Sequence, residues 1–153
     1  MARTKSKLQD AALGGTPDEV EAAFYEGLRG GDTEKVMSCW ADEDDIVCIH
    51  PGGARLLGAA AIRAAFEEMF SNGGTLHVDA ANVHQVQAVA CAVHHVSERV
   101  EVQTQRGPMQ AFVLATNVYI KTAQGWRMVV HHASPGTETQ MQEDVSSLPK
   151  VLH

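Results

Sequence analysis

Residues 109–134 read MQAFVLATNVYIKTAQGWRMVVHHAS, and this stretch decides the fold class. It contains two long runs, Met109–Thr122 and Trp126–Ser134, that are rich in β-branched and aromatic residues. Such residues favour strands, and the short glycine-containing connection at 123–125 is typical of a hairpin. The stretch therefore predicts two long antiparallel strands that lie side by side.

Two further strand candidates precede this hairpin. They span Thr75–Gln87 and Ala88–Gln103, and Gly107-Pro108 separates the second of them from Met109. Glycine and proline mark turns, so each strand is expected to reverse into the next. The second half of the chain is therefore predicted to be a meander of long strands.

The first half of the chain carries helical signals instead. Thr16-Pro17-Asp18-Glu19 combines an N-cap threonine, a proline at the first helical position and a glutamate that closes a capping box, and Gly30-Gly31 ends this helix. Asp32 can cap a second, short helix. A brief buried strand is predicted at Asp45–His50, and a third helix is predicted from Gly58 to the Ser-Asn-Gly-Gly at 71–74.

Three helices followed by long strands predict an α+β fold, with the helices packed on one face of a curved antiparallel sheet. In the last two strands, however, both alternating sets of side chains are mostly apolar. Both faces of the sheet are therefore expected to be covered. One would lie against the helices, and the other against a partner subunit or a second part of the sheet.

Length and charge narrow the classes of partner. The chain has 153 residues, the length of one domain, and a net charge of −7 with only 12 lysines and arginines. Binding to nucleic acid or to an anionic membrane needs clustered cations, so neither is an expected partner. We expect a leader at 1–15, a single domain at 16–134 and a C-terminal tail at 135–153, which lacks sustained periodicity.

The location in the cell follows from two further patterns. No apolar run approaches the roughly 20 residues that a membrane-spanning helix needs. The N-terminus lacks the apolar core of a secretory signal, and the three cysteines have no paired spacing. A cytoplasmic protein is therefore expected.

Polar side chains inside the apolar strands indicate an internal cavity. Thr116, Asn117 and His132 interrupt runs that are otherwise apolar. Burying them without partners would cost roughly 1–3 kcal/mol each, so each needs a hydrogen-bond partner, a water or a ligand. A concave apolar space with a few polar groups is the usual form of a small-molecule site.

Histidines are the main candidates for chemistry. His50 and His132 are the predicted catalytic residues, because an imidazole titrates near neutral pH and can move a proton. His50 ends a buried strand before a Pro-Gly-Gly turn, and the alternative is that it bonds to the turn backbone. Adjacent histidines in a strand, as at 94–95 and 131–132, point to opposite faces, and no metal-binding spacing is present. No metal and no cofactor are therefore expected.

Further side chains are predicted to line the cavity, each with a structural alternative. Arg55 could clamp a carboxylate or an enolate, or could pair with the acidic residues at 42–44. The two tryptophans could contact a ligand or simply fill the core. The predicted ligand-binding residues are Trp40, Arg55, His94, Asn117, Trp126 and Ser134.

Four sequence blocks carry a resemblance to a known family. They are DIVCIHPGG at 45–53, GAAAIRAAF at 58–66, ATNVY at 115–119 and GWRMVVHHAS at 125–134. Together they resemble the SnoaL-like branch of the nuclear transport factor 2-like (ketosteroid isomerase-like) superfamily, over roughly residues 18–134. The resemblance implies a cone-shaped α+β roll in which a bent antiparallel sheet wraps around three helices. It also implies a homodimer joined through the sheet.

The resemblance implies site residues but no single reaction. His50, Asn117, Trp126, His132 and Ser134 match positions in the motif blocks of the branch. Members of the superfamily include ketosteroid isomerases, polyketide cyclases, dehydratases, epoxide hydrolases and protein-association domains, so the fold does not select the activity. The chain departs from the steroid isomerases, because no acidic partner is evident for Tyr25 or Tyr119.

Two functional hypotheses follow. In the first, the protein is a cofactor-free isomerase, cyclase or dehydratase that acts on a small apolar carbonyl compound. His50 or His132 moves a proton next to the carbonyl, and Asn117, Arg55 or the indole N–H of Trp126 stabilises the oxyanion. In the second, the same fold serves as a non-catalytic module for ligand binding or protein association.

Overall fold

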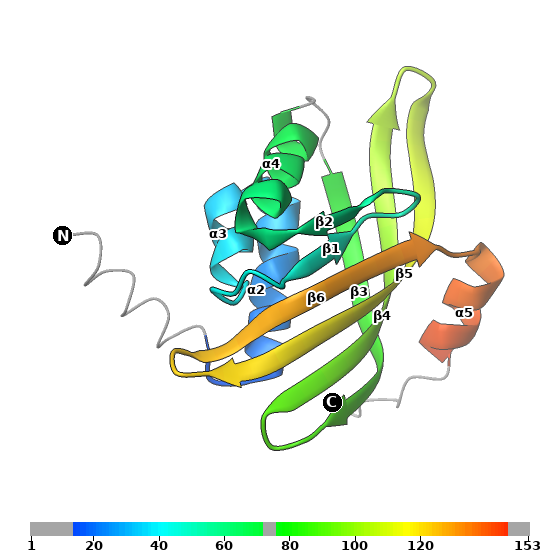
Figure 1. Ribbon diagram of the computed structural model, residues 1–153. Helices are drawn as coiled ribbons and strands as arrows, with labels where there is room; N and C mark the ends of the chain where they lie inside the picture. The colour runs from blue at the N-terminus through cyan, green and yellow to red at the C-terminus, as the bar shows by residue number, and fades with distance from the viewer. Residues whose placement is uncertain (1–13, 72–75, 147–153) are drawn as a thin grey trace.

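The computed structural model describes residues 14–71 and 76–146, and the predicted leader lies mostly outside them. The predicted helices and strands follow in the expected order, and the structure adds one strand and one helix to them (Figure 1). The helices are α2 (Pro17–Gly30), α3 (Thr33–Ser38), α4 (Gly58–Ser71) and α5 (Glu138–Ser146), and the strands are β1 (Val47–Ile49), β2 (Arg55–Leu57), β3 (Leu76–Gln87), β4 (Cys91–Thr104), β5 (Gly107–Thr122) and β6 (Gly125–Pro135).

The strands form one open sheet in the order β2-β1-β6-β5-β4-β3. The predicted meander of long strands is confirmed, since β3, β4, β5 and β6 pair antiparallel in sequence order. The curved sheet is antiparallel except at one pair, because β1 runs parallel to β6. Strand β2 turns back along β1 at the edge and was not predicted, since its three residues are too few for a recognisable pattern.

The start of α2 has the predicted N-cap. Thr16 lies in extended conformation, and its hydroxyl oxygen accepts a hydrogen bond from the backbone N–H of Glu19 at 3.1 Å. The helix ends where Gly31 takes up a left-handed conformation with φ of 60°, which favours glycine. Helix α2 contacts β3 and β6, so one side of the helix can contribute to an internal site.

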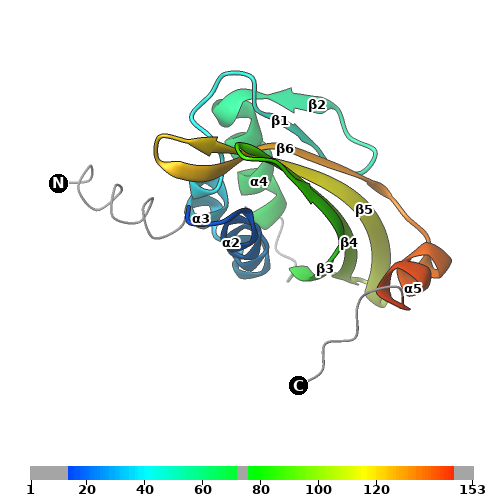
Figure 2. The same cartoon turned by 90° about the horizontal axis from the view of Figure 1, so that it is seen from below.

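The sheet curves around α2, α3 and α4, which lie on its concave side (Figure 2). We call this side of the sheet the inner face and the other side the outer face. The core between the helices and the inner face is continuous and includes large side chains that are fully buried: Phe24, Ile62, Phe66, Tyr119 and Met128. Along β4, β5 and β6 the inward side chains alternate with outward ones, as the period of a strand requires.

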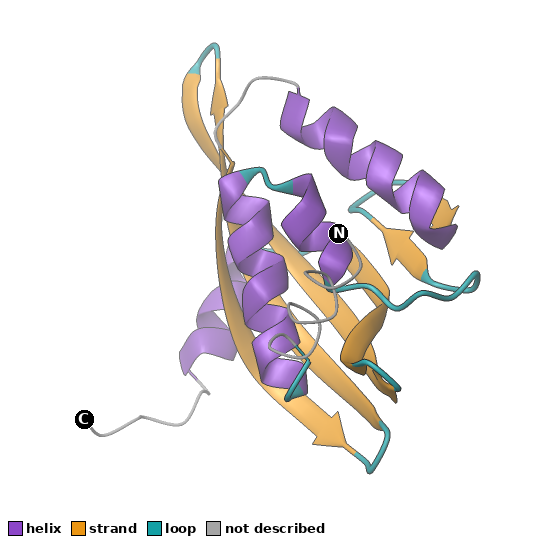
Figure 3. Ribbon diagram, turned by 90° about the vertical axis from the view of Figure 1, so that its left-hand side faces the viewer, coloured by secondary structure: helices purple, strands orange, loops and turns teal. Residues whose placement is uncertain are grey.

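Helix α5 lies on the opposite side of the sheet from the other helices (Figure 3). Met141 of this helix is buried, and Asp144 accepts a hydrogen bond from the Ser97 hydroxyl at 2.6 Å. Part of the predicted tail is therefore a helix packed on the outer face, and its weak amphipathic pattern explains why periodicity did not reveal it. Within the described residues no helix is both long and apolar enough to cross a membrane.

Candidate functional site

A cavity of about 360 Å³ lies between the inner face of the sheet and the helices α2 and α4. Aliphatic and aromatic side chains such as Leu28, Phe66 and Val78 make most of its wall. The titratable side chains in the wall are His50, Glu98 and His131. The volume falls at the small end of the range of about 300–1,000 Å³ that is typical of small-molecule sites.

Glu98 is a buried carboxyl group in the wall of this cavity. It lies on the inward side of β4 between Val96 and Val100 and is 5% exposed. Burial, together with repulsion from the Glu21 carboxylate, raises the pKa of Glu98 to about 7. Near neutral pH the group is therefore present in both its acid and its base form, as general acid–base catalysis requires.

Tyr25 is the hydrogen-bond partner of Glu98. Its hydroxyl donates to Oε2 of Glu98 at 2.6 Å, across from helix α2 to strand β4. This bond stabilises the ionised carboxylate and opposes the effect of burial on its pKa. The expectation that Tyr25 has no acidic partner is therefore wrong.

His131 is joined to the same pair through Asn117. Oδ1 of Asn117 lies 2.6 Å from Nδ1 of His131, and Nδ2 of Asn117 donates to the Tyr25 hydroxyl at 3.1 Å. Burial, and then repulsion from His50 and His132, lowers the pKa of His131 to about 3. The ring is neutral at physiological pH, and because Nδ1 donates to an amide oxygen, Nε2 is the unprotonated nitrogen.

His50 lies at the turn that follows β1 and is half-buried. Its ring packs edge-on against Phe66, with centroids 5.1 Å apart, and lies 6.3 Å from the ring of His131. Burial lowers the pKa of His50, so this ring is neutral as well. A neutral imidazole keeps one N–H that it can donate to a ligand.

The charges around the cavity indicate the class of ligand that it suits. Across 14–71 and 76–146, no lysine or arginine lines the cavity, and no three His, Cys, Asp or Glu side chains are placed to hold a metal ion. An anionic ligand would lose its hydration without gaining a cationic partner. An uncharged, mostly apolar ligand with one or two polar atoms fits this wall.

His94 belongs to a second buried cluster, apart from the cavity. Its Nδ1 is hydrogen-bonded to Oε2 of Glu21, which also accepts a hydrogen bond from the Tyr119 hydroxyl at 2.9 Å. Asn82 donates to the other oxygen of Glu21 at 3.2 Å. The cluster joins α2 to β3, β4 and β5, and His94 does not line the inner cavity.

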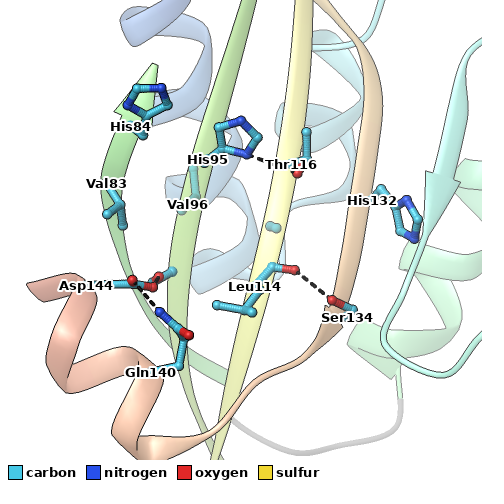
Figure 4. Close-up of a pocket in the computed structure, with 12 residues that line it drawn as sticks. Val83, His84, His95, Val96, Leu114, Thr116, His132, Ser134, Gln140 and Asp144 are labelled. Atoms are coloured by element: carbon cyan, nitrogen blue, oxygen red, sulfur yellow. Dashed lines mark hydrogen bonds between the residues drawn. The ribbon is translucent and has the colours of Figure 1, made fainter. Parts of the chain in front are cut away.

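His132 faces the outer side of the sheet. It lines an open hollow of about 620 Å³ together with His95, Thr116 and Ser134, and α5 borders this hollow (Figure 4). His50 lines the inner cavity, so the structure places the two predicted catalytic histidines on opposite sides of the sheet. They cannot act together on one small molecule.

The remaining predicted residues are distributed over the fold. Asn117 is fully buried and links His131 to Tyr25. Both tryptophans lie in the core, where the indole N–H of Trp40 has no hydrogen-bond partner among the described residues. Arg55 is exposed on β2 and Ser134 is exposed on β6. At the inner cavity the structure therefore brings together His50 and, through His131, Asn117, whereas His132 and Ser134 meet in the outer hollow.

Sequence reasoning missed Glu98, His131 and Tyr25. A signal for Glu98 was present, because residues 92, 94, 96, 98 and 100 share one side of β4 and, apart from Glu98 and His94, are apolar. A carboxylate on that side must be buried. No sequence signal identified Tyr25. The pattern around a tyrosine in a helix does not distinguish a side chain that fills the core from one that donates to an acid 73 positions away.

The outer face carries a row of aliphatic side chains across all six strands. Register pairs connect each strand to the next, and the members are Leu57, Val47, Val130, Val118, Val93 and Val86. We call these six residues the aliphatic row. Leu57 and Val86, at its two ends, are each 58% exposed. Beside it runs a second register row, with the members Arg55, Ile49, His132, Thr116, His95 and His84.

Comparison with protein families gives a match over most of the chain. The model of the SnoaL-like domain matches residues 18–138. No curated protein matches the chain in sequence.

Solved structures share the fold. A protein from Thiobacillus denitrificans, named as a candidate calcium/calmodulin-dependent protein kinase type II association domain, is 36% identical, with a TM-score of 0.74, over 82% of this chain and 98% of that one. A candidate dehydratase of the nuclear transport factor 2-like family from Streptomyces avermitilis is 26% identical, with a TM-score of 0.70, over 77% and 92%. A ketosteroid isomerase-like protein from Erwinia carotovora atroseptica is 16% identical, with a TM-score of 0.68, over 78% and 93%, and so shares the fold alone.

Proposed function

The chain belongs to the SnoaL-like domain family, and from this premise we propose that its inner cavity binds a small, uncharged, mostly apolar carbonyl compound and moves a proton on it without a cofactor. The observation that carries this proposal is the position of Glu98, a carboxyl group with a pKa near 7 in the wall of an apolar cavity. The similarity to a candidate dehydratase, at 26% identity, is consistent with chemistry of this class.

The proposed step uses Glu98 as the base. Its carboxylate takes a proton from the carbon next to the carbonyl group, and the electron pair of that C–H bond moves towards the carbonyl oxygen. The N–H of the neutral His50 ring stabilises the charge on this oxygen. In a compound with a C=C bond beyond that carbon, return of the proton from Glu98 to the far carbon of the double bond completes an isomerisation. In a compound with a hydroxyl group on the next carbon, that group leaves with the proton held by Glu98 as water, which completes a dehydration.

Hydrogen–deuterium exchange tests the step without knowledge of the natural substrate. A panel of cyclic ketones and enones is incubated with the protein in D₂O, and exchange at the carbon next to the carbonyl is followed by NMR. We expect exchange with at least one compound, and a loss of roughly 100-fold or more in Glu98→Gln. Glu101→Gln is the matched control, because it makes the same change on the same strand three residues away, outside the cavity wall.

Two results would contradict the catalytic proposal. One is exchange that persists at the wild-type rate in Glu98→Gln. The other is tighter binding of 2-naphthoate than of 2-naphthol, since a cavity that prefers the anion does not have the charge properties described above.

A second candidate function is self-association through the outer face. The aliphatic row extends across five strand-to-strand steps, about 24 Å at about 4.8 Å each. It contains no charged side chain, and within the described residues α5 covers only the neighbouring part of the face, near Ser97. A second copy of the chain is its best match, because an aliphatic row is complementary to itself. The 36% identity to a candidate association domain also supports this role.

Sedimentation velocity tests this second candidate. The wild type is expected to sediment as a dimer, and Val93→Asp, in the middle of the row, as a monomer with unchanged circular dichroism. Val102→Asp is the control on the same strand outside the row. A monomeric wild type, or equal behaviour of the two variants, would contradict association through this face.

A further inference from the structure

Asn117 connects two polar groups of the cavity wall without lining the cavity itself. The hydrogen-bonded chain runs from His131 on β6 through Asn117 on β5 and Tyr25 on α2 to Glu98 on β4, with distances of 2.6, 3.1 and 2.6 Å. All four side chains are buried. The core around these side chains has a low dielectric constant. A donor or acceptor left without a partner there is costly, so each group in the chain needs its hydrogen bond.

When Glu98 is ionised it can only accept, and the direction of every bond in this chain is then determined by its neighbours. The Tyr25 hydroxyl has one hydrogen and donates it to Glu98, so towards Asn117 it can only accept. The amide group of Asn117 must then present its NH₂ to Tyr25 and its oxygen to His131. An amide oxygen only accepts, so the hydrogen of the neutral His131 ring has to be on Nδ1. Asn117 thereby determines the tautomer of His131.

The other ring nitrogen of His131 is available to a ligand. Nε2 makes no hydrogen bond with any described residue, and it is not enclosed by protein in the way that the indole nitrogen of Trp40 is. His131 lines the cavity and its Nδ1 is bonded to Asn117, so we infer that the lone pair of Nε2 faces the cavity. The ionised form of Glu98, in the same wall, also only accepts. A ligand that satisfies both groups has to bring hydrogen-bond donors of its own.

We propose that Asn117 is a positioning residue that holds Nε2 of His131 as a hydrogen-bond acceptor towards the cavity, and that the substrate is therefore a carbonyl compound that also carries a hydroxyl group. This inference about the substrate class rests on the proposed function. The role of Asn117 does not, because it concerns the free protein.

NMR of the protein with ¹⁵N-labelled histidine tests the role of Asn117 directly. In the wild type we expect His131 to show a protonated Nδ1 and an unprotonated Nε2. Asn117→Leu removes the acceptor and is expected to shift the ring towards the Nε2–H tautomer, which predominates for free histidine in water. Asn117→Asp restores an acceptor at the same place and is expected to restore the wild-type tautomer. Thr116→Val, the neighbour on the outer face, is the control.

The experiment tests the role of Asn117 even if a variant fails to fold, because the wild-type spectrum alone can contradict it. A wild-type spectrum in which His131 carries its hydrogen on Nε2 overturns the proposed role of Asn117. An Asn117→Leu variant that folds and keeps the wild-type tautomer overturns it as well. Neither result depends on whether the protein is an enzyme.

A matched pair of ligands tests the substrate class. 2-Naphthol and 2-methoxynaphthalene have the same ring system, but the methyl ether lacks the donor hydrogen. We expect the wild type to bind 2-naphthol roughly tenfold more tightly, and Asn117→Leu to bind the two compounds about equally. Equal affinities in the wild type, or an unchanged preference in Asn117→Leu, would overturn the inference. If neither compound binds, the proposed function and the substrate class both fail, and the NMR result still decides the role of Asn117.

Discussion

His131 and His132 are neighbours in the chain, yet they belong to two different surfaces of the protein. His131 is 3% exposed, bonds to Asn117 and lines the inner cavity, whereas His132 is exposed and lines the outer hollow. Side chains alternate along a strand, and the irregularity in the register between β5 and β6 at Val118 and Tyr119 sets which of the two histidines points inwards. The two rings are therefore expected to respond differently to acid.

The first prediction concerns the loss of stability in acid. Burial lowers the pKa of His131 from its ordinary 6.5 to about 3, so between these values the unfolded chain binds a proton that the folded chain does not. The free energy of unfolding must then fall as the pH is lowered through this window. We expect His131→Gln to remove this part of the pH dependence, measured by urea denaturation between pH 4 and 8. His132→Gln should keep it, and a wild-type slope in His131→Gln would contradict the assignment.

The second prediction concerns Glu98 and has the opposite sign. Burial raises the pKa of this group from 4.5 to about 7, so in this window the folded chain binds a proton that the unfolded chain has released. The free energy of unfolding is therefore expected to fall as the pH rises, by about 3 kcal/mol in total for a shift of this size.

Glu98→Gln isolates this contribution. Between pH 4.5 and 6.5 the effects of Glu98 and His131 oppose each other in the wild type, so the difference between variant and wild type has to be measured at each pH. We expect the stability of Glu98→Gln relative to the wild type to increase from pH 5 to pH 8, and Glu101→Gln to show no such trend. A difference that stays constant over this range would mean that Glu98 titrates like an exposed carboxyl group.

The fold could be predicted from the sequence because its signals are local. The capping residues Thr16 and Glu19, the turn at 123–125 and the β-branched runs around Val113 and Val129 each act over a few positions. The parallel pairing of β1 with β6 could not be predicted in this way, because it joins Val47 to Val130. A three-residue strand carries no information about its partner.

The candidate site was only partly predictable for the same reason. His50 could be identified, because its position between a buried strand and a Pro-Gly-Gly turn is a local property. The choice of His132 over His131 assumed that side chains alternate strictly along the strand. The register irregularity in this strand pair interrupts the alternation, so counting positions does not tell which histidine points inwards. The bond between Tyr25 and Glu98 joins a helix to a strand, and the spacing of residues does not reveal it.

The third prediction concerns the second buried cluster. His94→Leu leaves the carboxyl group of Glu21 in the core with the Tyr119 hydroxyl and the Asn82 amide as its remaining partners. Breaking a buried ionic or hydrogen-bonded pair on one side costs roughly 3–5 kcal/mol. We expect a loss of this size in the free energy of unfolding, measured with urea at pH 7.

Two comparisons show whether that loss comes from the pair itself. His95→Leu, at the adjacent exposed position, should change the stability by less than about 0.5 kcal/mol. The double variant His94→Leu, Glu21→Leu should be less destabilised than the sum of the two single variants, since no unpaired carboxyl group remains. Strict additivity would indicate that His94 and Glu21 do not interact in the folded protein.

The fourth prediction concerns the entrance to the inner cavity. Ala111 on β5 lines the cavity and is at the same time exposed, so a larger side chain there can narrow the opening without disturbing the core. We expect Ala111→Trp to reduce the affinity for 2-naphthol at least tenfold and to leave the free energy of unfolding within about 0.5 kcal/mol of the wild type. Gln110→Trp adds the same side chain one residue away, pointing to the other face, and should bind like the wild type. If both variants bind 2-naphthol normally while Glu98→Gln does not, the ligand reaches Glu98 by another route, and the opening beside Ala111 is not the entrance.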